Sequence, residues 1–165
     1  MVPPTTPATT IRPARPADLA AIGRLGALLV RMHHELDPER FIAPPPEIEQ
    51  GYASFLGRQL AKDGVVVLVA ERAGAVLGYT YAGMEGPDFM ALRGPAGAVY
   101  DIVVDPAQRG QGVGRLLVEA TVTALAALGA PRVLLSTAAG NEPAQRLFAR
   151  AGFRRTMIEM TREIE

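Results

Sequence analysis

The chain contains no cysteine, so disulfide bonds and thiolate metal sites are excluded and no secretory context is suggested. Its 17 basic and 17 acidic residues give a formal net charge of zero, which offers no electrostatic footprint for nucleic acid. No apolar run approaches the roughly 18 residues that a membrane-spanning helix needs. Two adjacent histidines, His33 and His34, are a poor basis for a metal site. These absences favour a cytoplasmic protein without metal, nucleic-acid or membrane partners.

The first ten residues, MVPPTTPATT, lack the basic region followed by an apolar one that marks a signal peptide. We predict that residues 1–10 form a short disordered tail. Residues 11–165 suffice for one domain with a hydrophobic core, and they contain no internal repeat. Lys62 is the only lysine among the 17 basic residues, and with abundant Ala, Gly and Pro this indicates a GC-rich bacterial genome.

Hydrophobic periodicity predicts the elements of this domain. Residues 65–70 are too apolar for a strand with one wet face, which predicts a sheet covered on both sides. Asp18 is expected to cap the first helix. The predicted elements are a strand at 11–13, helices at 18–36 and 47–62, strands at 65–70, 75–84 and 98–104, a helix at 112–128, a strand at 132–136, a helix at 142–151 and a strand at 153–164.

The most informative segment is Gln108-Arg109-Gly110-Gln111-Gly112-Val113-Gly114, between a predicted strand and a predicted helix. A glycine-rich turn at this place exposes N–H groups at the positive end of the helix dipole, which suits a pyrophosphate. The spacing does not match the G-x-G-x-x-G of dinucleotide sites, and no lysine follows as in a P-loop. A phosphate-bearing cofactor is therefore predicted, and a glycine turn without a ligand is the alternative.

A second segment runs from Asn141 to Phe153 as NEPAQRLFARAGF. It resembles the N-x-x-A-x-x-[LF]-[YF]-x-x-x-G-F segment of the GCN5-related N-acetyltransferase (GNAT) superfamily, whose acetyl-CoA motif the R-x-x-G-x-G of residues 109–114 also resembles. The resemblance covers residues 98–163 well and residues 11–97 only by element order. It implies an α/β (α+β) fold in which a mixed, mostly antiparallel central sheet carries helices on both faces, in the order β-α-α-β-β-β-α-β-α-β.

The resemblance also implies acetyl-CoA as the acyl donor. The pyrophosphate would lie on the N–H groups of residues 109–115, and the pantetheine arm would run beside residues 102–104, where the N–H of Val103 or Val104 would polarise the thioester. Asn141 would contact the cofactor, or cap its helix, or do both. Arg115 is equally typical of a solvated helix start. The residues expected at the cofactor are Ile102, Val103, Val104, Arg109, Gly110, Gln111, Gly112, Val113, Gly114, Arg115, Asn141 and Phe148.

The chain departs from the family at two positions whose side chains are thought to transfer protons in other members. Many members carry a tyrosine where this chain has Phe148, and some carry a glutamate at the place of Ser136. Asp101 is the first choice for the base, because it lies on the strand beside the expected thioester, and a structural carboxylate is the alternative.

Tyr100 and His33 are the other catalytic candidates, although Tyr100 is also typical of packing and His33 of a solvated helix end. Glu35, Tyr79, Tyr81 and Glu85 are weaker candidates for binding a cationic amine.

Two functions therefore remain open. One is an acetyl-CoA-dependent N-acetyltransferase acting on the primary amine of a small molecule or peptide, and the other is a non-catalytic acyl-CoA-binding sensor. A nucleotide-binding switch is disfavoured, because the P-loop lysine and hydroxyl are absent. The resemblance implies that loops at residues 37–46 and 85–97 form the acceptor pocket, and that a homodimer is one expected assembly.

Overall fold

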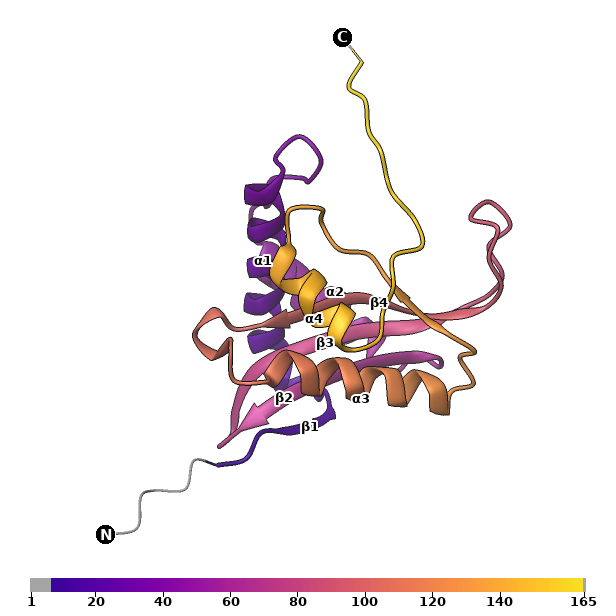
Figure 1. Ribbon diagram of the computed structural model, residues 1–165. Helices are drawn as coiled ribbons and strands as arrows, with labels where there is room; N and C mark the ends of the chain where they lie inside the picture. The colour runs from indigo at the N-terminus through magenta and orange to yellow at the C-terminus, as the bar shows by residue number, and fades with distance from the viewer. Residues whose placement is uncertain (1–6, 165) are drawn as a thin grey trace.

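The computed structural model describes residues 7–164, which fold around one five-stranded sheet (Figure 1). The strands lie in chain order, with three antiparallel pairings followed by a parallel pairing of the last two. The mixed, mostly antiparallel sheet is thus confirmed. The strands are β1 (Thr10–Pro13), β2 (Val65–Arg72), β3 (Ala75–Glu85), β4 (Ala96–Val104) and β5 (Val133–Leu135).

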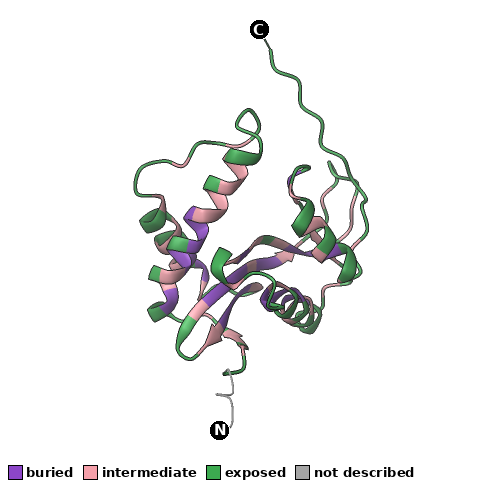
Figure 2. Cartoon of the chain, turned by 60° about the vertical axis from the view of Figure 1, so that its left-hand side comes forward, coloured by how far each residue is buried: buried purple, intermediate pink, exposed green. Residues whose placement is uncertain are grey.

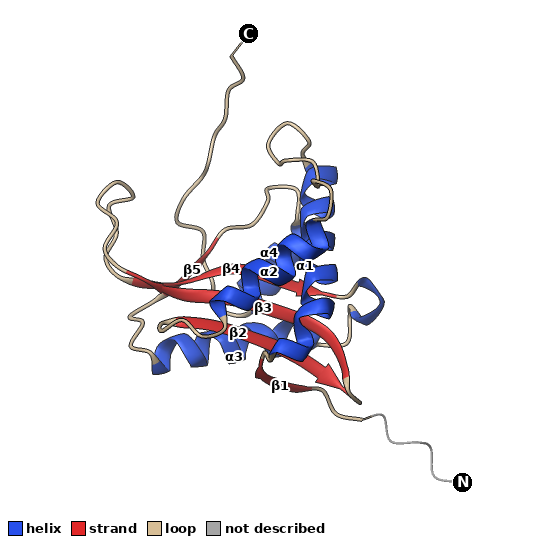
Figure 3. Cartoon of the chain, turned by 180° about the vertical axis from the view of Figure 1, so that it is seen from behind, coloured by secondary structure: helices blue, strands red, loops and turns tan. Residues whose placement is uncertain are grey.

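Helices cover both faces of the sheet. They are α1 (Leu19–Leu36) and α2 (Ile48–Gln59) on one face, α3 (Val113–Ala127) on the other, and α4 (Glu142–Arg150) next to α3. Seen from behind, α1 and α2 lie in front of the strands (Figure 3). None of these described helices is long and apolar enough to cross a membrane.

Alternating side chains of β2 explain why helices are needed on both faces. Val67 and Val69 pack with Ile22 of α1, whereas Val66 and Leu68 pack with Leu125 of α3. Buried residues accordingly concentrate on the sheet and on the helix faces turned toward it (Figure 2). The absence of a wet face on this strand, predicted from its composition, is confirmed.

A glycine sets the distance between α1 and α2. A Cβ atom at Gly26 would lie 2.2 Å from the ring of Tyr52, a distance that no side chain tolerates. Glycine therefore allows the ring of Tyr52 to lie against α1 and close one wall of the cavity described below.

The predicted strand at residues 153–164 is wrong. This segment contains no strand, and it extends away from the body of the molecule (Figure 1). Its apolar side chains, including Met157 and Ile158, are exposed, and no described strand pairs with it. The residue pattern suits a strand, but a strand also requires a hydrogen-bonded partner. The segment is held instead by polar side-chain contacts to Gln145 and Arg40.

Asp18 is the N-cap residue of α1, as predicted, but its side chain does not cap the helix. A short 3-10 turn (Pro16–Asp18) precedes α1, and the Asp18 carboxylate makes no capping bond to α1. It accepts hydrogen bonds from the Arg12 guanidinium at 2.8 and 3.0 Å and from the Arg15 N–H at 2.7 Å. Bonds to a guanidinium are stronger than bonds to a neutral amide, which explains the preference.

Element boundaries also differ in places from the prediction. Of the predicted tail, residues 1–6 lie outside the described part, and Thr10 already pairs with Glu71. The second helix ends at Gln59 rather than 62. The predicted loop at 85–97 shortens to residues 86–95, because β3 continues to Glu85 and β4 begins at Ala96.

Candidate active site

Strand β4 has a free edge over its second half. Strand β5 pairs only with residues 97–99, so no described strand lies beside residues 100–104 on that side. Tyr100 is an extra residue in the β3–β4 ladder, where Tyr81 faces Asp101 and Ala82 faces Val99. Such a bulge bends the strand and re-aims its side chains. An extended ligand therefore finds unpaired backbone groups at this edge.

The register decides which N–H groups point to the free edge. The N–H of Asp105 donates to the carbonyl of Leu77, at 2.8 Å, on the β3 side. Donors alternate along a strand, so the N–H of Val103 also points to β3. The N–H groups of Ile102 and Val104 point the other way, to the free edge.

The glycine-rich loop leads from this edge into α3. Gly110 and Gly112 have φ of 75° and 80°, values that glycine adopts without strain. A Cβ atom at either residue would meet nothing within 4 Å, so open space lies in front of the loop. No described group accepts a hydrogen bond from the N–H groups of residues 110–115, and no side chain caps α3. Free N–H groups, open space and a helix N-terminus together fit a pyrophosphate.

Arg72 holds this loop from the end of β2. Its Nη1 donates to Oε1 of Gln111 at 2.7 Å and to Oε1 of Gln108 at 3.5 Å. No motif in the sequence points to Arg72, because its contact depends on how the β2–β3 hairpin lies against the loop. Arg109 and Arg115 are both exposed, and the Arg109 guanidinium lies 3.9 Å from the sulfur of Met32 on α1.

Replacing Arg72 by methionine is expected to weaken acetyl-CoA binding several-fold, because the loop then loses two hydrogen bonds that fix its shape. Isothermal titration with acetyl-CoA measures the effect. Arg58→Met, on α2, is the matched control and should bind like the wild type. An unchanged dissociation constant for Arg72→Met would show that Arg72 does not position the loop.

Asn141 lies at the start of α4, and Phe148 lies on the helix itself. The Oδ1 of Asn141 accepts a hydrogen bond from the N–H of Ala144 at 3.3 Å, so Asn141 caps the helix. Phe148 is only 6% exposed, and its ring packs edge-on against Phe153 at 6.0 Å between centroids. Ser136 is exposed. Phe148 therefore contributes packing and has no hydroxyl to donate a proton.

Asp101 is the partly buried acid of this region. Its Oδ2 accepts a hydrogen bond from the hydroxyl of Tyr79 at 2.9 Å. Burial raises the pKa of the Asp101 carboxyl, while the Tyr79 bond and the nearby His33 oppose that rise. Tyr79 is completely buried, so it orients this carboxylate and does not contact an amine directly.

Two adjoining cavities open beside Asp101, with volumes of about 230 and 240 Å³. Both are lined by Tyr52, Tyr100 and Asp101. The first, which we call the α2 cavity, is completed by Ile48, Gly51, Phe55 and Tyr81. The second, the α1 cavity, is completed by Leu29, Val30, His33, Phe41 and Ile42. The loop at 37–46 thus contributes Phe41 and Ile42 to a cavity wall, whereas no residue of 85–97 lines either cavity.

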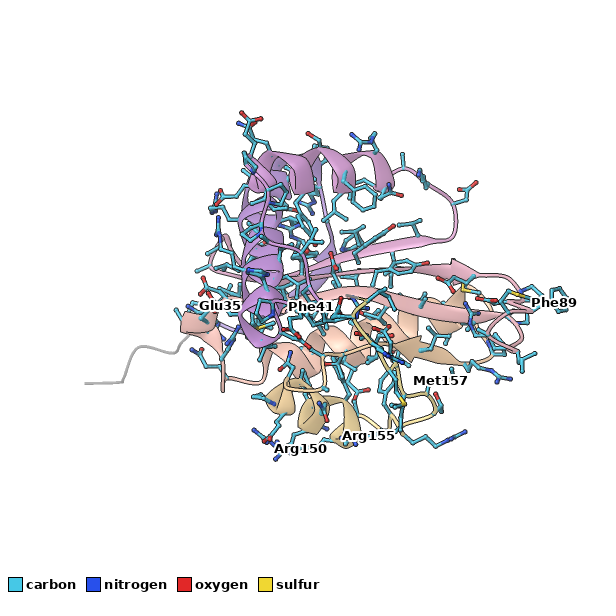
Figure 4. All side chains as sticks on the ribbon, turned by 90° about the horizontal axis from the view of Figure 1, so that it is seen from above. Glu35, Phe41, Phe89, Arg150, Arg155 and Met157 are labelled. Carbon is cyan, nitrogen blue, oxygen red and sulfur yellow. The ribbon has the colours of Figure 1, made fainter. Side chains whose placement is uncertain are left out.

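His33 and Asp101 lie in the same cavity wall although they come from different elements. The Nδ1 of His33 donates to the carbonyl of Leu29 at 2.8 Å when it carries the proton, which leaves Nε2 as an acceptor. The His33 ring also packs edge-on against Phe41, with 4.9 Å between centroids. Glu35, by contrast, is exposed at the end of α1 (Figure 4).

Tyr100 reaches away from Asp101. Its hydroxyl donates to Oε1 of Glu85 at 2.9 Å, and burial together with this bond raises the pKa of Tyr100 to about 12. Glu85 also forms an ion pair with Arg93. Glu85 is therefore already neutralised by a cation of its own chain. Among residues 7–164 no group of three or more histidine or acidic side chains is arranged to hold a metal ion.

Known proteins resemble this chain in sequence. Mycothiol acetyltransferases from Thermobispora bispora and a Nocardioides species are 38% and 35% identical to it over 96 and 97 residues. These matches cover 56% and 55% of this chain but 31% and 33% of those proteins. The chain thus spans about a third of the length of the curated relatives it matches.

The fold is also shared with solved structures. A mutant of the BH1408 protein from Bacillus halodurans superposes with a TM-score of 0.81 at 21% identity, covering 94% of this chain and 99% of that one. An aminoglycoside N-acetyltransferase, AAC(6')-Iy, in complex with CoA gives 0.75 at 19% identity, covering 99% of both chains. The model of the acetyltransferase (GNAT) family matches residues 29–153. The chain belongs to the acetyltransferase (GNAT) family.

Proposed function

We propose that this chain transfers an acetyl group from acetyl-CoA to the primary amine of a small molecule or peptide, with both substrates bound together. The main support for this proposal is that a site suited to the donor and a site suited to the acceptor both lie beside β4. The free edge of residues 100–104 leads along the chain to the glycine loop before α3, and the Asp101 cavities open beside the same strand. Family membership and the names of the relatives support acetyl transfer.

Residues on β4 and α3 would hold the donor, and acetyl-CoA supplies an activated acetyl thioester when bound. The N–H groups of residues 110–115 and the α3 dipole suit its pyrophosphate, and Arg109 and Arg115 add charge. The N–H groups of Ile102 and Val104 suit an extended pantetheine arm at the free edge. Val104 is a better donor to the thioester oxygen than Val103, because the N–H of Val103 is directed to β3.

Asp101 would remove the proton of the attacking amine, directly or through water. Its raised pKa makes it a stronger base than an exposed aspartate, and Tyr79 fixes its orientation. The amine nitrogen forms the amide bond as the sulfur leaves. Phe148 has no hydroxyl, so the leaving thiolate takes its proton from water. His33 is a second group that can accept a proton in the same cavity.

A non-catalytic acyl-CoA sensor is the second candidate, and it is favoured by the buried phenyl ring of Phe148 and the exposed Ser136 at the proton-handling places. Thiol release from acetyl-CoA at pH 8 over a panel of amines separates the two. The acetyltransferase predicts amine-dependent thiol release on at least one amine, with a matching mass increase of the acceptor. Tight acetyl-CoA binding with no turnover on any amine would support the sensor.

A further inference from the structure

The cavities beside Asp101 are built mainly from apolar and aromatic side chains. The α2 cavity receives Phe55 from α2, Tyr81 from β3 and Tyr100 from β4, and one carboxylate, that of Asp101, lies at its wall. The α1 cavity adds aliphatic side chains and the imidazole of His33. Such walls gain free energy when they bury the apolar surface of a ligand.

Three of the four rings that line the α2 cavity form a continuous aromatic wall. Phe55 meets Tyr81 edge-on with 5.6 Å between ring centroids, and Tyr81 lies 4.9 Å from Tyr100 at a tilt of 42°. A further ring placed in the cavity would extend this arrangement in the offset or edge-on geometries that aromatic pairs prefer. The volume of about 230 Å³ exceeds the roughly 150 Å³ of an apolar cavity that accommodates benzene.

The charges near the cavity suit one amine rather than several. Among the described residues, Asp101 is the one carboxylate that lines it, and Glu85 is paired with Arg93 while accepting a hydrogen bond from the hydroxyl of Tyr100. Burying a second cationic group here would leave it without a carboxylate partner, which is costly. Acceptors with several amines are therefore disfavoured.

From these walls we infer that the acceptor is a primary amine carrying an aromatic ring, with the ring in the α2 cavity and the amine at Asp101. This inference rests on the proposed function and narrows its substrate class. A free arylalkylamine and a peptide with an N-terminal phenylalanine share this chemistry. The ring is bound by Phe55, Tyr81 and Tyr100, and the amine by the carboxylate of Asp101.

The first test compares amines on the wild-type protein. With saturating acetyl-CoA, kcat/KM for 2-phenylethylamine is expected to exceed that for ethylamine by at least about tenfold, because the ring adds buried apolar surface. The kcat/KM for a tripeptide that begins with phenylalanine shows whether the acceptor is a peptide or a free arylalkylamine. Equal or better use of glucosamine, spermidine or kanamycin would overturn the inference while leaving acetyl transfer intact.

The second test changes the wall. Phe55→Gln removes a ring that is 40% exposed on α2, and it is expected to raise KM for 2-phenylethylamine about tenfold with kcat and the KM for acetyl-CoA nearly unchanged. The matched control is Phe89→Gln, whose ring is 80% exposed at the protruding loop of residues 86–95 (Figure 4). Equal KM values for the two variants would contradict the assigned wall.

A binding measurement separates failure of this inference from failure of the proposed function. Calorimetric titration of 2-phenylethylamine into the protein with CoA present reports ring recognition without turnover. Binding that is weakened by Phe55→Gln, with no acetylation of any amine, would support the ring site and contradict the acetyltransferase. Acetylation of other amines without binding of 2-phenylethylamine would contradict the ring site and support the acetyltransferase.

Discussion

Replacing Gly112 by glutamate is expected to raise the dissociation constant for acetyl-CoA by about 100-fold or more. Gly112 is the residue before α3, and the space in front of its Cα is open, so a side chain there would enter the approach of the pyrophosphate. The glutamate carboxylate would also lie close to the negative charge of the pyrophosphate. Two like charges about 4 Å apart repel by about 4 kcal/mol near a protein surface. Isothermal titration with acetyl-CoA measures the loss.

Gly129→Glu is the matched control for this variant. Gly129 follows α3 at its other end, has φ of 90°, and a Cβ there also meets nothing within 4 Å. Both variants therefore carry the same backbone strain of about 1 to 2 kcal/mol, but only one lies at the loop. Gly129→Glu should bind acetyl-CoA like the wild type. Near-normal affinity of a folded Gly112→Glu protein would refute the assignment of the phosphate site.

Asp101→Asn is expected to lower kcat by about 100-fold to 10,000-fold, the usual effect of losing a general base. The amide keeps an oxygen for the hydroxyl of Tyr79, so the position of the side chain is retained. The affinity for acetyl-CoA should stay unchanged, because Asp101 faces the cavities rather than the glycine loop. Steady-state kinetics with the best amine measures the effect. Unchanged turnover would remove Asp101 from the mechanism and leave His33 as the base.

The same variant should be more stable than the wild type at neutral pH. Because burial raises the pKa of Asp101 above its usual value of 3.8, the fold favours the protonated carboxyl, and ionisation costs stability. This cost is absent well below pH 3.8 and appears as the pH rises through the raised pKa. A rise of one in the pKa corresponds to about 1.4 kcal/mol, or about 3 to 5 °C in Tm for a chain of this size.

Thermal unfolding of the wild type and of Asp101→Asn between pH 3 and pH 8 follows this difference. The two Tm curves should converge at low pH and separate as the pH rises, with the variant above the wild type. Curves that separate in the opposite sense would show that the ionised carboxylate stabilises the fold. In that case Asp101 would be a structural residue.

The sequence predicted the parts of the fold that depend on local patterns. The apolar run at 65–70 correctly indicated a strand covered on both faces, and the glycine turn before α3 lies where its residues placed it. Asn141 as a helix cap also follows from local preference, and the structure confirms it. The final strand at 153–164 could not be settled in this way, because strand formation depends on a partner elsewhere in the chain.

The arrangement of the candidate site depended on contacts between distant segments. The bulge at Tyr100 and the register of β3 against β4 bring Tyr79 to Asp101, and neither is visible in a single sequence. The aromatic wall combines Phe55 of α2 with Tyr81, and these residues carry no motif. Sequence motifs therefore indicated the donor site, whereas the acceptor cavities became visible only in the folded chain.

The most direct test of the account is a titration of 15N-labelled protein with acetyl-CoA, followed by amide chemical shifts. The largest shifts are expected at the N–H groups of residues 110–115 and at those of Ile102 and Val104, while the N–H of Val103, which is directed to β3, should shift less. Saturating shifts confined to other parts of the chain, or no shifts at millimolar acetyl-CoA, would contradict this expectation.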